Sequence, residues 1–202
     1  MKSLILFGNG GHCKSCIEVI ENTGKYLIKG IIVHPNDFSD KFMDYKVLGN
    51  DKNMDEKFCK DDLAFICIGQ IKSVEKRKRI FKILEEKKIL LATIKSKFAI
   101  ISKHAVIKNG TIVMNNSIVN SSAYIGINCI LNTNSLIEHD AIIGDHCHIS
   151  TGAIINGGAK IGNECFVGSG AIIREGVTVG DRSIISSGQV VMNDLPPKSL
   201  VK

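Results

Sequence analysis

Ile101-Ser102-Lys103-His104-Ala105-Val106-Ile107 opens a stretch in which an aliphatic residue recurs at every sixth position. The series continues without a break through Val113, Val119, Ile125, Leu131, Ile137, Ile143, Ile149, Ile155, Ile161, Val167, Ile173, Val179 and Ile185 to Val191. A small residue stands two positions before most of these aliphatics. A period of six does not fit an α-helix, which has about 3.6 residues per turn. It is typical of a hexapeptide-repeat parallel β-helix.

Residues 18 apart should stack on one face of this coil, because three hexads make one turn. Cysteines at the small-residue position have this spacing, and we expect them to be apolar fillers inside the coil: Cys129, Cys147 and Cys165. Glycines with the same spacing mark a corner that needs a residue without a Cβ: Gly126, Gly144, Gly162 and Gly180. The Pro-containing segment 193–197 is expected to end the repeat.

The first hundred residues have a different pattern. Apolar runs predict strands at residues 4–7, 26–33, 63–68 and 89–94. Helical periodicity is present in the stretch that closes at Gly24 and in residues 73–88. This alternation predicts a small parallel α/β sheet of about four strands. We therefore expect a Rossmann-like α/β domain over residues 1–98, followed by an all-β parallel β-helix over residues 99–202.

The net charge of +6 belongs to the first half, where residues 1–100 hold 19 basic and 13 acidic side chains. This excess could attract an anionic small molecule, but the basic run at residues 72–88 is interpreted as a solvated helix face. Few aromatics and the lack of an Arg-rich stripe disfavour nucleic acid as a partner. No apolar run is long enough for a bilayer, and the N-terminal one is too short for a signal peptide. We expect a cytoplasmic protein that does not bind membranes.

The polar residues of the two halves include few candidates for metal binding. Cys13 and Cys16 form a C-x-x-C motif on a predicted helix without a second pair, so zinc or redox chemistry is disfavoured there. A zinc site from His139, His146 and His148 is conceivable, but the spacing does not resemble that of gamma-class carbonic anhydrases. We expect no metal and seven reduced cysteines.

The turn at residues 8–12 follows a strand and opens a helix, which places backbone N–H groups and the positive end of the helix dipole at the carboxyl edge of the sheet. Such a turn suits a phosphate or carboxylate, although it could also be purely structural. The G-x-G-x-x-G spacing is absent because Cys13 occupies the sixth position. No acidic residue ends the second strand, where His34-Pro35 stands instead. A phosphate-bearing sugar nucleotide is therefore favoured over NAD.

The coil carries a histidine followed by a carboxylate, His139-Asp140, just after the inward Ile137. An adjacent carboxylate raises the basicity of an imidazole and can fix its tautomer, which suits a general base. Consecutive side chains diverge on a regular strand, so this pairing requires a corner or a bend. His148 directly precedes the inward Ile149, and it should project from the outer surface of the coil.

Together these segments resemble the bacterial sugar acetyltransferases of the sialic-acid O-acetyltransferase and bacillosamine-pathway N-acetyltransferase type. The resemblance covers almost the whole chain. Its most specific element is Ile137-Glu138-His139-Asp140 inside perfect hexads. The matching segments are residues 6–12, 65–69, 130–140, 143–145, 148–150 and 166–169.

The resemblance implies a left-handed β-helix and a homotrimer, with acetyl-CoA lying along the coil between neighbouring subunits. It implies that His139 acts as the catalytic base and that Asp140 raises its basicity. It places His148 near the acetyl group of the cofactor and assigns two serines to the CoA path, Ser169 and Ser187. It assigns the sugar nucleotide to four residues of the front domain, Gly10, Gly11, His12 and Gly69.

The expected function is acetyl-CoA-dependent N-acetylation of an amino group on a nucleotide-linked amino-deoxy sugar, for surface glycan or nonulosonic acid biosynthesis. The alternative is O-acetylation of sialic acid or a related sugar, which the same coil could perform. A non-catalytic β-helix scaffold is a third possibility. The replacement of an acidic pair by His34-Pro35 after the second strand leaves the identity of the nucleotide open.

Overall fold

The computed structural model describes residues 1–37, 39–50, 54, 57–59 and 61–202. Its internal contacts divide the chain into two compact units. Unit 1 comprises Met1–Gly69 and Glu75–Ala92, and unit 2 comprises Gln70–Val74 and Thr93–Lys202. The domain boundary expected after residue 98 stays a prediction, because internal contacts do not test whether either half folds alone.

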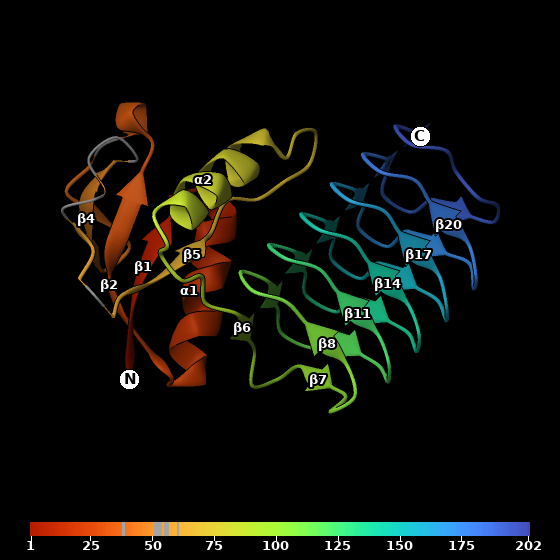
Figure 1. Ribbon diagram of the computed structural model, residues 1–202, viewed down its shortest axis with the longest axis horizontal. Helices are drawn as coiled ribbons and strands as arrows, with labels where there is room; N and C mark the ends of the chain where they lie inside the picture. The colour runs from red at the N-terminus through yellow and green to blue at the C-terminus, as the bar shows by residue number, and fades with distance from the viewer. Residues whose placement is uncertain (38, 51–53, 55–56, 60) are drawn as a thin grey trace. The chain divides into compact units, whose positions relative to one another are not determined.

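Unit 1 contains a five-stranded sheet in the order β3-β4-β2-β1-β5. Its strands are β1 (Lys2–Phe7), β2 (Tyr26–Val33), β3 (Lys41–Phe42), β4 (Tyr45–Asn50) and β5 (Leu63–Ile66). The other elements are the helices α1 (Gly11–Thr23) and α2 (Glu75–Glu86) and the short 3-10 turn η1 (Pro35–Asp37). Strand β1 is parallel to β2 and to β5, and its last four residues are buried. Figure 1 labels β1, β2, β4, β5, α1 and α2.

The predicted α/β class is confirmed, but the strand assignment needs two corrections. Strands β3 and β4, which pair antiparallel to each other, were not predicted, because their segments are polar and half-exposed. The predicted strand at residues 89–94 is not a strand of this sheet. Only Leu91 bridges to Ala64, and the following β6 (Ile94–Lys95) pairs with the coil. An apolar run alone could not show which sheet it joins.

Unit 2 is a parallel β-helix with three faces, as predicted. The six-stranded sheet consists of β7 (Ile100–Ile101), β10 (Ile118–Val119), β13 (Leu136–Ile137), β16 (Ile154–Ile155), β19 (Ile172–Ile173) and β22 (Val190–Val191). The five-stranded sheet consists of β8 (Val106–Ile107), β11 (Tyr124–Ile125), β14 (Ile142–Ile143), β17 (Lys160–Ile161) and β20 (Thr178–Val179). The seven-stranded sheet consists of β6, β9 (Ile112–Val113), β12 (Ile130–Leu131), β15 (His148–Ile149), β18 (Phe166–Val167), β21 (Ile184–Ile185) and β23 (Leu200–Val201). Figure 1 shows β8, β11, β14, β17 and β20 as a ladder of successive coils.

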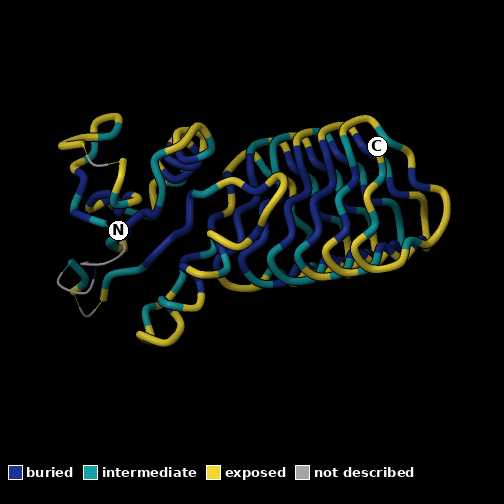
Figure 2. The backbone as a smooth tube through the Cα atoms, turned by 90° about the horizontal axis from the view of Figure 1, so that it is seen from above, coloured by how far each residue is buried: buried dark blue, intermediate teal, exposed yellow. Residues whose placement is uncertain are grey.

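The repeat aliphatics form the core of the coil. From Val113 to Val191 they are at most 4% exposed, and Figure 2 shows buried backbone running through every coil while exposed backbone lies mainly at the corners. The three stacked cysteines are buried too. Each thiol donates a hydrogen bond to a glycine carbonyl of the next coil, at 3.1 Å for Cys129, 2.9 Å for Cys147 and 3.3 Å for Cys165. The prediction that they are packing residues is confirmed.

The coil does not end at residue 193. Leu195 bridges to Val179, and β23 pairs with β21, so two more inward residues continue the ladder after Val191. The turn between Val191 and Leu195 is shorter than a hexad, which hid these positions from a strict period of six. The expected stop was therefore wrong, because the prolines lie at a corner rather than in a strand.

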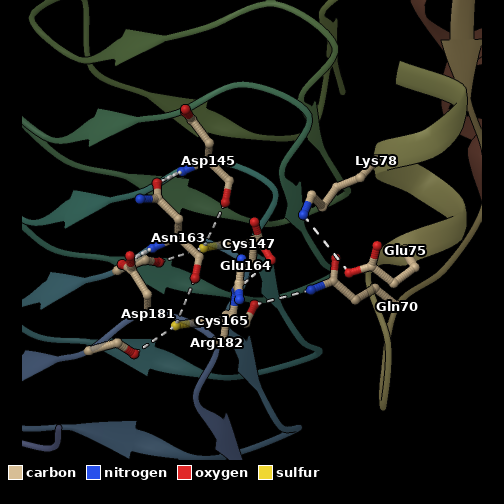
Figure 3. Close-up of polar contacts among 12 residues, drawn as sticks. Gln70, Glu75, Lys78, Asp145, Cys147, Asn163, Glu164, Cys165, Asp181 and Arg182 are labelled. Atoms are coloured by element: carbon tan, nitrogen blue, oxygen red, sulfur yellow. Dashed lines mark hydrogen bonds and ion pairs between the residues drawn. The ribbon is translucent and has the colours of Figure 1, made fainter. Parts of the chain in front are cut away.

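The corner glycines are required by stacking and not by an unusual backbone angle. None of the four has a positive φ. A Cβ on Gly144 would lie 2.8 Å from the carbonyl carbon of Gly162 and 2.9 Å from the backbone nitrogen of Asn163. At this corner Asn163 Oδ1 accepts a hydrogen bond from the backbone N–H of Asp145 (2.8 Å), and Asp181 Oδ1 accepts one from Asn163 (2.7 Å; Figure 3). Successive coils are thus in contact here.

We expect Gly144→Ala to lower the free energy of unfolding by about 3 kcal/mol, because the methyl group meets backbone atoms that cannot move independently. The matched control is Gly152→Ala on the same coil. It should cost only about 1–2 kcal/mol, since its φ is +65° and a Cβ there meets no atom within 4 Å. Denaturant unfolding of both variants measures the difference, and equal losses would contradict the stacking argument.

Candidate functional site

His139 and Asp140 lie at the corner between β13 and β14. Asp140 has a φ of +60°, and this left-handed bend brings two consecutive side chains together that would diverge on a strand. The distance between His139 Nδ1 and Asp140 Oδ2 is 2.8 Å. Both side chains are exposed, at 66% and 65%. The pairing of His139 with Asp140, which was expected to require a bend, is therefore present.

The environment of His139 favours a base at the outer ring nitrogen. The hydrogen bond with Asp140, together with the negative charges of Asp140 and then Glu138, raises the pKa of His139 above its ordinary value. With the Nδ1 proton donated to Asp140, Nε2 keeps a free lone pair. The backbone N–H of His139 also donates to Glu138 Oε2 at 3.3 Å. The arrangement can accept a proton from a bound nucleophile.

A residue that the sequence analysis missed makes space for the imidazole. Gly157 lies one coil further on, and a Cβ there would be 2.8 Å from both Cε1 and Nε2 of His139. Only glycine leaves the ring in its present position. The 18-residue stacking period could have found it, since residue 157 follows residue 139 by one coil.

The pairing predicts the pH dependence of any reaction in which His139 is the base. Activity should rise with pH through the raised pKa of His139, because only the neutral imidazole accepts a proton. Asp140→Asn removes the main cause of the shift, so the acidic limb of the kcat profile should move to lower pH while its plateau falls. In contrast, Glu138→Gln should move the limb only slightly, because Glu138 is the last of the causes. An unchanged profile in Asp140→Asn would exclude the pairing from catalysis.

His148 leaves β15 on the outer face of the coil, as expected, but it is only 6% exposed because other residues cover it. Its Nδ1 donates to the carbonyl oxygen of Gln70 at 2.5 Å, and its Nε2 accepts from Asn132 Nδ2 at 3.2 Å. The ring of Phe166 packs edge-on at 5.3 Å. Gln70 is held in turn by a bond from its Nε2 to the Cys165 carbonyl (3.4 Å; Figure 3). The hexad pattern could not reveal that a segment distant in sequence lies on this face.

Ser169 and Ser187 lie at a different corner from His139. They are exposed, follow β18 and β21, and stack one coil apart; Ser169 Oγ is 3.0 Å from Ser150 Oγ. This corner joins the seven-stranded to the six-stranded sheet, whereas His139 lies where the six-stranded sheet passes to the five-stranded one. Within one chain the width of a sheet therefore separates these serines from His139.

Unit 1 contains a pocket of about 320 Å³ at the carboxyl ends of β1, β2 and β5. All four residues predicted for the sugar nucleotide line it: Gly10, Gly11, His12 and Gly69. A Cβ on Gly10 or Gly11 would meet no atom within 4 Å, so the backbone at the start of α1 is open to a ligand. Gly8, in contrast, has a φ of +115° and lies against Ile68, as a tight turn requires.

Three charged residues of this pocket were not predicted. Lys76 and Arg79 reach it from α2, in the run that the sequence analysis interpreted as a solvated face. Asp37 reaches it from the end of η1, although no acidic residue directly follows β2. Lys76 and Arg79 are spaced by three residues and lie near the buried Ile80, and this spacing could have indicated that both lie on the same side of the helix as Ile80. The position of Asp37 depends on the short 3-10 turn, which the sequence analysis did not identify.

Two family descriptions match parts of the chain. Residues 3–84 match the PglD N-terminal domain, and residues 158–191 match the bacterial transferase hexapeptide family, described as six repeats. The first match covers most of unit 1, and the second lies in the coil. No curated protein sequence matches the chain. Among the described residues, no helix is long and apolar enough to cross a membrane.

Solved structures match both units together. A mutant of perosamine N-acetyltransferase from Caulobacter crescentus, in complex with CoA and GDP-perosamine, is 26% identical with a TM-score of 0.90, covering 99% of this chain and 93% of its own. The acetyltransferase domain of PglB from Neisseria gonorrhoeae, in complex with acetyl coenzyme A, is 25% identical with a TM-score of 0.89, covering 96% and 93%. WeeI from Acinetobacter baumannii, at 21% identity and a TM-score of 0.88, covers 99% and 96% and shares the fold. This chain therefore combines a PglD-type N-terminal domain with bacterial transferase hexapeptide repeats, it matches hexapeptide-repeat sugar acetyltransferases in structure, and it is an acyltransferase.

Proposed function

We propose that the protein transfers the acetyl group of acetyl-CoA to the amino group of a nucleotide-linked amino-deoxy sugar, for surface glycan or nonulosonic acid biosynthesis. The observation that carries the proposal is the contact between His139 and Asp140 at an exposed corner of the coil. The similarity to a perosamine N-acetyltransferase in complex with CoA and GDP-perosamine supports the choice of donor and acceptor. A nucleotide-sized pocket in unit 1 agrees with this choice.

In the proposed reaction, His139 Nε2 removes a proton from the acceptor amine as its nitrogen adds to the thioester carbonyl. The C–N bond forms, the C–S bond breaks, and CoA leaves as the thiolate. Asp140 holds the proton on Nδ1 and stabilises the imidazolium that develops. General base catalysis of this kind contributes about 10²–10⁴-fold.

We assign the acyl donor to the outer surface of the coil, where Ser169 and Ser187 offer exposed hydroxyl groups one coil apart. Both ring nitrogens of His148 are engaged within the chain. Its proposed part in cofactor binding is therefore to hold the Asn132 amide and to shape the surface near the acetyl group. Direct proton transfer by His148 would first require the loss of one of these hydrogen bonds.

We propose a homotrimer, because within a single chain His139 and the serines Ser169 and Ser187 lie at different corners of the coil. An aliphatic stripe follows the outer face of the six-stranded sheet between the two corners: Ile100, Ile118, Leu136, Ile154, Ile172 and Val190. Its terminal members, Ile100 and Val190, are 65% and 55% exposed. Apolar surface of this extent favours contact with a second copy, which could place the serines of one chain near His139 of another. Light scattering after gel filtration measures the proposed state.

The sugar nucleotide is assigned to the unit 1 pocket. The open backbone at Gly10 and Gly11 and the start of α1 suit phosphate oxygens. Lys76 and Arg79 add positive charge opposite this turn, and Asp37 can accept a hydrogen bond from a ribose or base. His12 and Gly69 complete the wall.

We expect Lys76→Ala and Arg79→Ala each to raise the KM for the nucleotide sugar about tenfold, because each removes a charge-assisted contact with phosphate. The KM for acetyl-CoA should stay unchanged. Lys82→Ala is the matched control on the same helix, since Lys82 is 76% exposed and ion-paired with Glu86. Steady-state kinetics, with each substrate varied in turn, measures both KM values. An equal rise in both KM values would argue against phosphate binding by α2.

The proposed function is tested by thiol release from acetyl-CoA with UDP-, GDP- and dTDP-linked 4-amino sugars and with sialic acids as acceptors. Turnover of one nucleotide-linked amino sugar, with an amide product, is the expected result. Turnover of sialic acids alone would replace N-acetylation by O-acetylation. Absence of turnover, together with no thermal stabilisation by acetyl-CoA, would reduce the chain to a scaffold.

A further inference from the structure

The fold supplies a third thiol to the Cys13-x-x-Cys16 motif, which has no second pair in the sequence. Cys13 and Cys16 lie on the buried side of α1, and Cys67 directly follows β5. All three are free thiols, exposed by 1% or less. After burial, interactions with the thiols of Cys13 and Cys16 contribute to the raised pKa of Cys67. The proposed acetyl transfer uses none of these three thiols.

Two basic side chains lie beside this cluster. His12 Nε2 is 3.4 Å from the Cys16 sulfur. Arg77, which is 1% exposed, donates through Nη1 to the carbonyl oxygens of Ile68 (2.5 Å) and Ile66 (3.4 Å), on either side of Cys67. The His12 ring therefore lies beside Cys16, and the Arg77 guanidinium lies beside the backbone that flanks Cys67.

The surroundings make the two central thiols unequal. Burial by itself would raise the pKa of Cys16, but the hydrogen bond from Cys67, the charge and hydrogen bond of His12, and the charge of Arg77 outweigh it and lower that pKa. The pKa of Cys67 is raised, first by burial and then by its neighbouring thiols. A pair of one thiolate and one thiol is the arrangement that oxidation to a disulfide uses.

The cluster is next to a route for a small oxidant. His12 and Cys67 both form part of the wall of the unit 1 pocket. No group of three or more His, Cys, Asp or Glu in the described part of the chain is arranged to hold a metal ion. Redox chemistry is therefore better supported here than metal binding.

We propose that Cys16 and Cys67 form a reversible disulfide, driven by a peroxide, beneath the unit 1 pocket. The Cys16 thiolate attacks one oxygen of hydrogen peroxide and becomes a sulfenic acid, with release of hydroxide. The Cys67 sulfur then attacks the Cys16 sulfur, the S–S bond forms, and the sulfenic oxygen leaves as water. In total, two thiols and one peroxide yield one disulfide and two waters. His12 loses its anionic partner in the pocket wall. The modification does not depend on the proposed acetyl transfer.

The test uses the reduced full-length protein and a small molar excess of hydrogen peroxide. We expect the intact mass to fall by about 2 Da per chain, the mass of the two hydrogen atoms lost, and to recover with dithiothreitol. Digestion without reductant should release one peptide pair that joins the segments of Cys16 and Cys67. Oxygen addition without this cross-link would overturn the proposal. So would a cross-link that forms only after the protein is unfolded in denaturant.

Variants identify the sulfur atoms. Cys16→Ser and Cys67→Ser should each abolish the cross-link, whereas Cys13→Ser and Cys59→Ser should keep it; Cys59 is the exposed cysteine. Thermal unfolding establishes that each variant is folded, and the wild-type peptide map stands even where a variant is not. A cross-link that persists in Cys16→Ser would assign the chemistry to Cys13 and contradict the proposal.

Discussion

Replacing His139 with asparagine should lower kcat by about 10²–10⁴-fold, because the amide cannot take the proton from the acceptor amine. The KM values should change little, since the proton transfer belongs to the transition state and not to ground-state binding. His139 is 66% exposed, so the substitution should leave thermal stability nearly unchanged. Thiol release from acetyl-CoA at saturating acceptor measures the effect.

The control for this substitution is His104→Asn, because His104 is another exposed histidine of the coil. It should retain full activity. If His139→Asn also kept full acetyl transfer, the proposed mechanism would be wrong whichever acceptor the enzyme uses. A loss of activity together with a loss of the folded state would instead indicate a structural role, and circular dichroism separates these two results.

Gly157→Ala should lower kcat by about 10–100-fold without touching the base chemically. The new Cβ would lie 2.8 Å from Cε1 and Nε2 of His139, so the exposed ring must rotate away from Asp140. A displacement of about 1 Å in a catalytic group is enough for a loss of about 10²-fold. The first atoms met belong to a mobile side chain and not to backbone, so stability should fall far less than in Gly144→Ala.

The readout specific to this role is the titration of His139 followed by NMR. In Gly157→Ala, the pKa of His139 should fall back toward its ordinary value, because the hydrogen bond to Asp140 is its largest cause of elevation. Gly158→Ala is the matched control. It has a φ of +66°, and a Cβ there meets no atom within 4 Å, so it should cost stability while leaving the His139 titration and kcat in place. An unchanged titration in Gly157→Ala would refute the steric argument.

The coil could be predicted almost completely because its restraints are local and periodic. Each aliphatic from Val113 onward meets its equivalents one coil away, so the spacing alone identifies the inward positions. The prediction failed where the spacing breaks, at the short turn before Leu195. It also failed for β3 and β4, whose half-exposed residues lack a continuous apolar run.

The candidate site likewise contains residues that a local sequence pattern identifies and residues that it does not. The residues His139 and Asp140, together with the turn at 8–12, are contiguous in sequence and could be selected from it. Gly157, Asp37 and Arg79 were not selected. The 18-residue period and the helical spacing were signals for Gly157 and Arg79, but the contacts that give all three residues a role are made with segments distant in sequence. The burial of His148 under Gln70 is the clearest case, since the hexad pattern places the side chain on the outer face without showing what covers it.

By itself, the sequence determined the class of fold, the stacking of the coil and the residues on which chemistry was proposed. These follow from hydrophobic periodicity, which is a property of neighbouring positions. Only the tertiary structure decided that Gln70 covers His148, that Asp37 and α2 line the pocket, and that Cys67 lies near Cys13 and Cys16. These are contacts between segments distant in sequence, and no local pattern encodes which of them close in space.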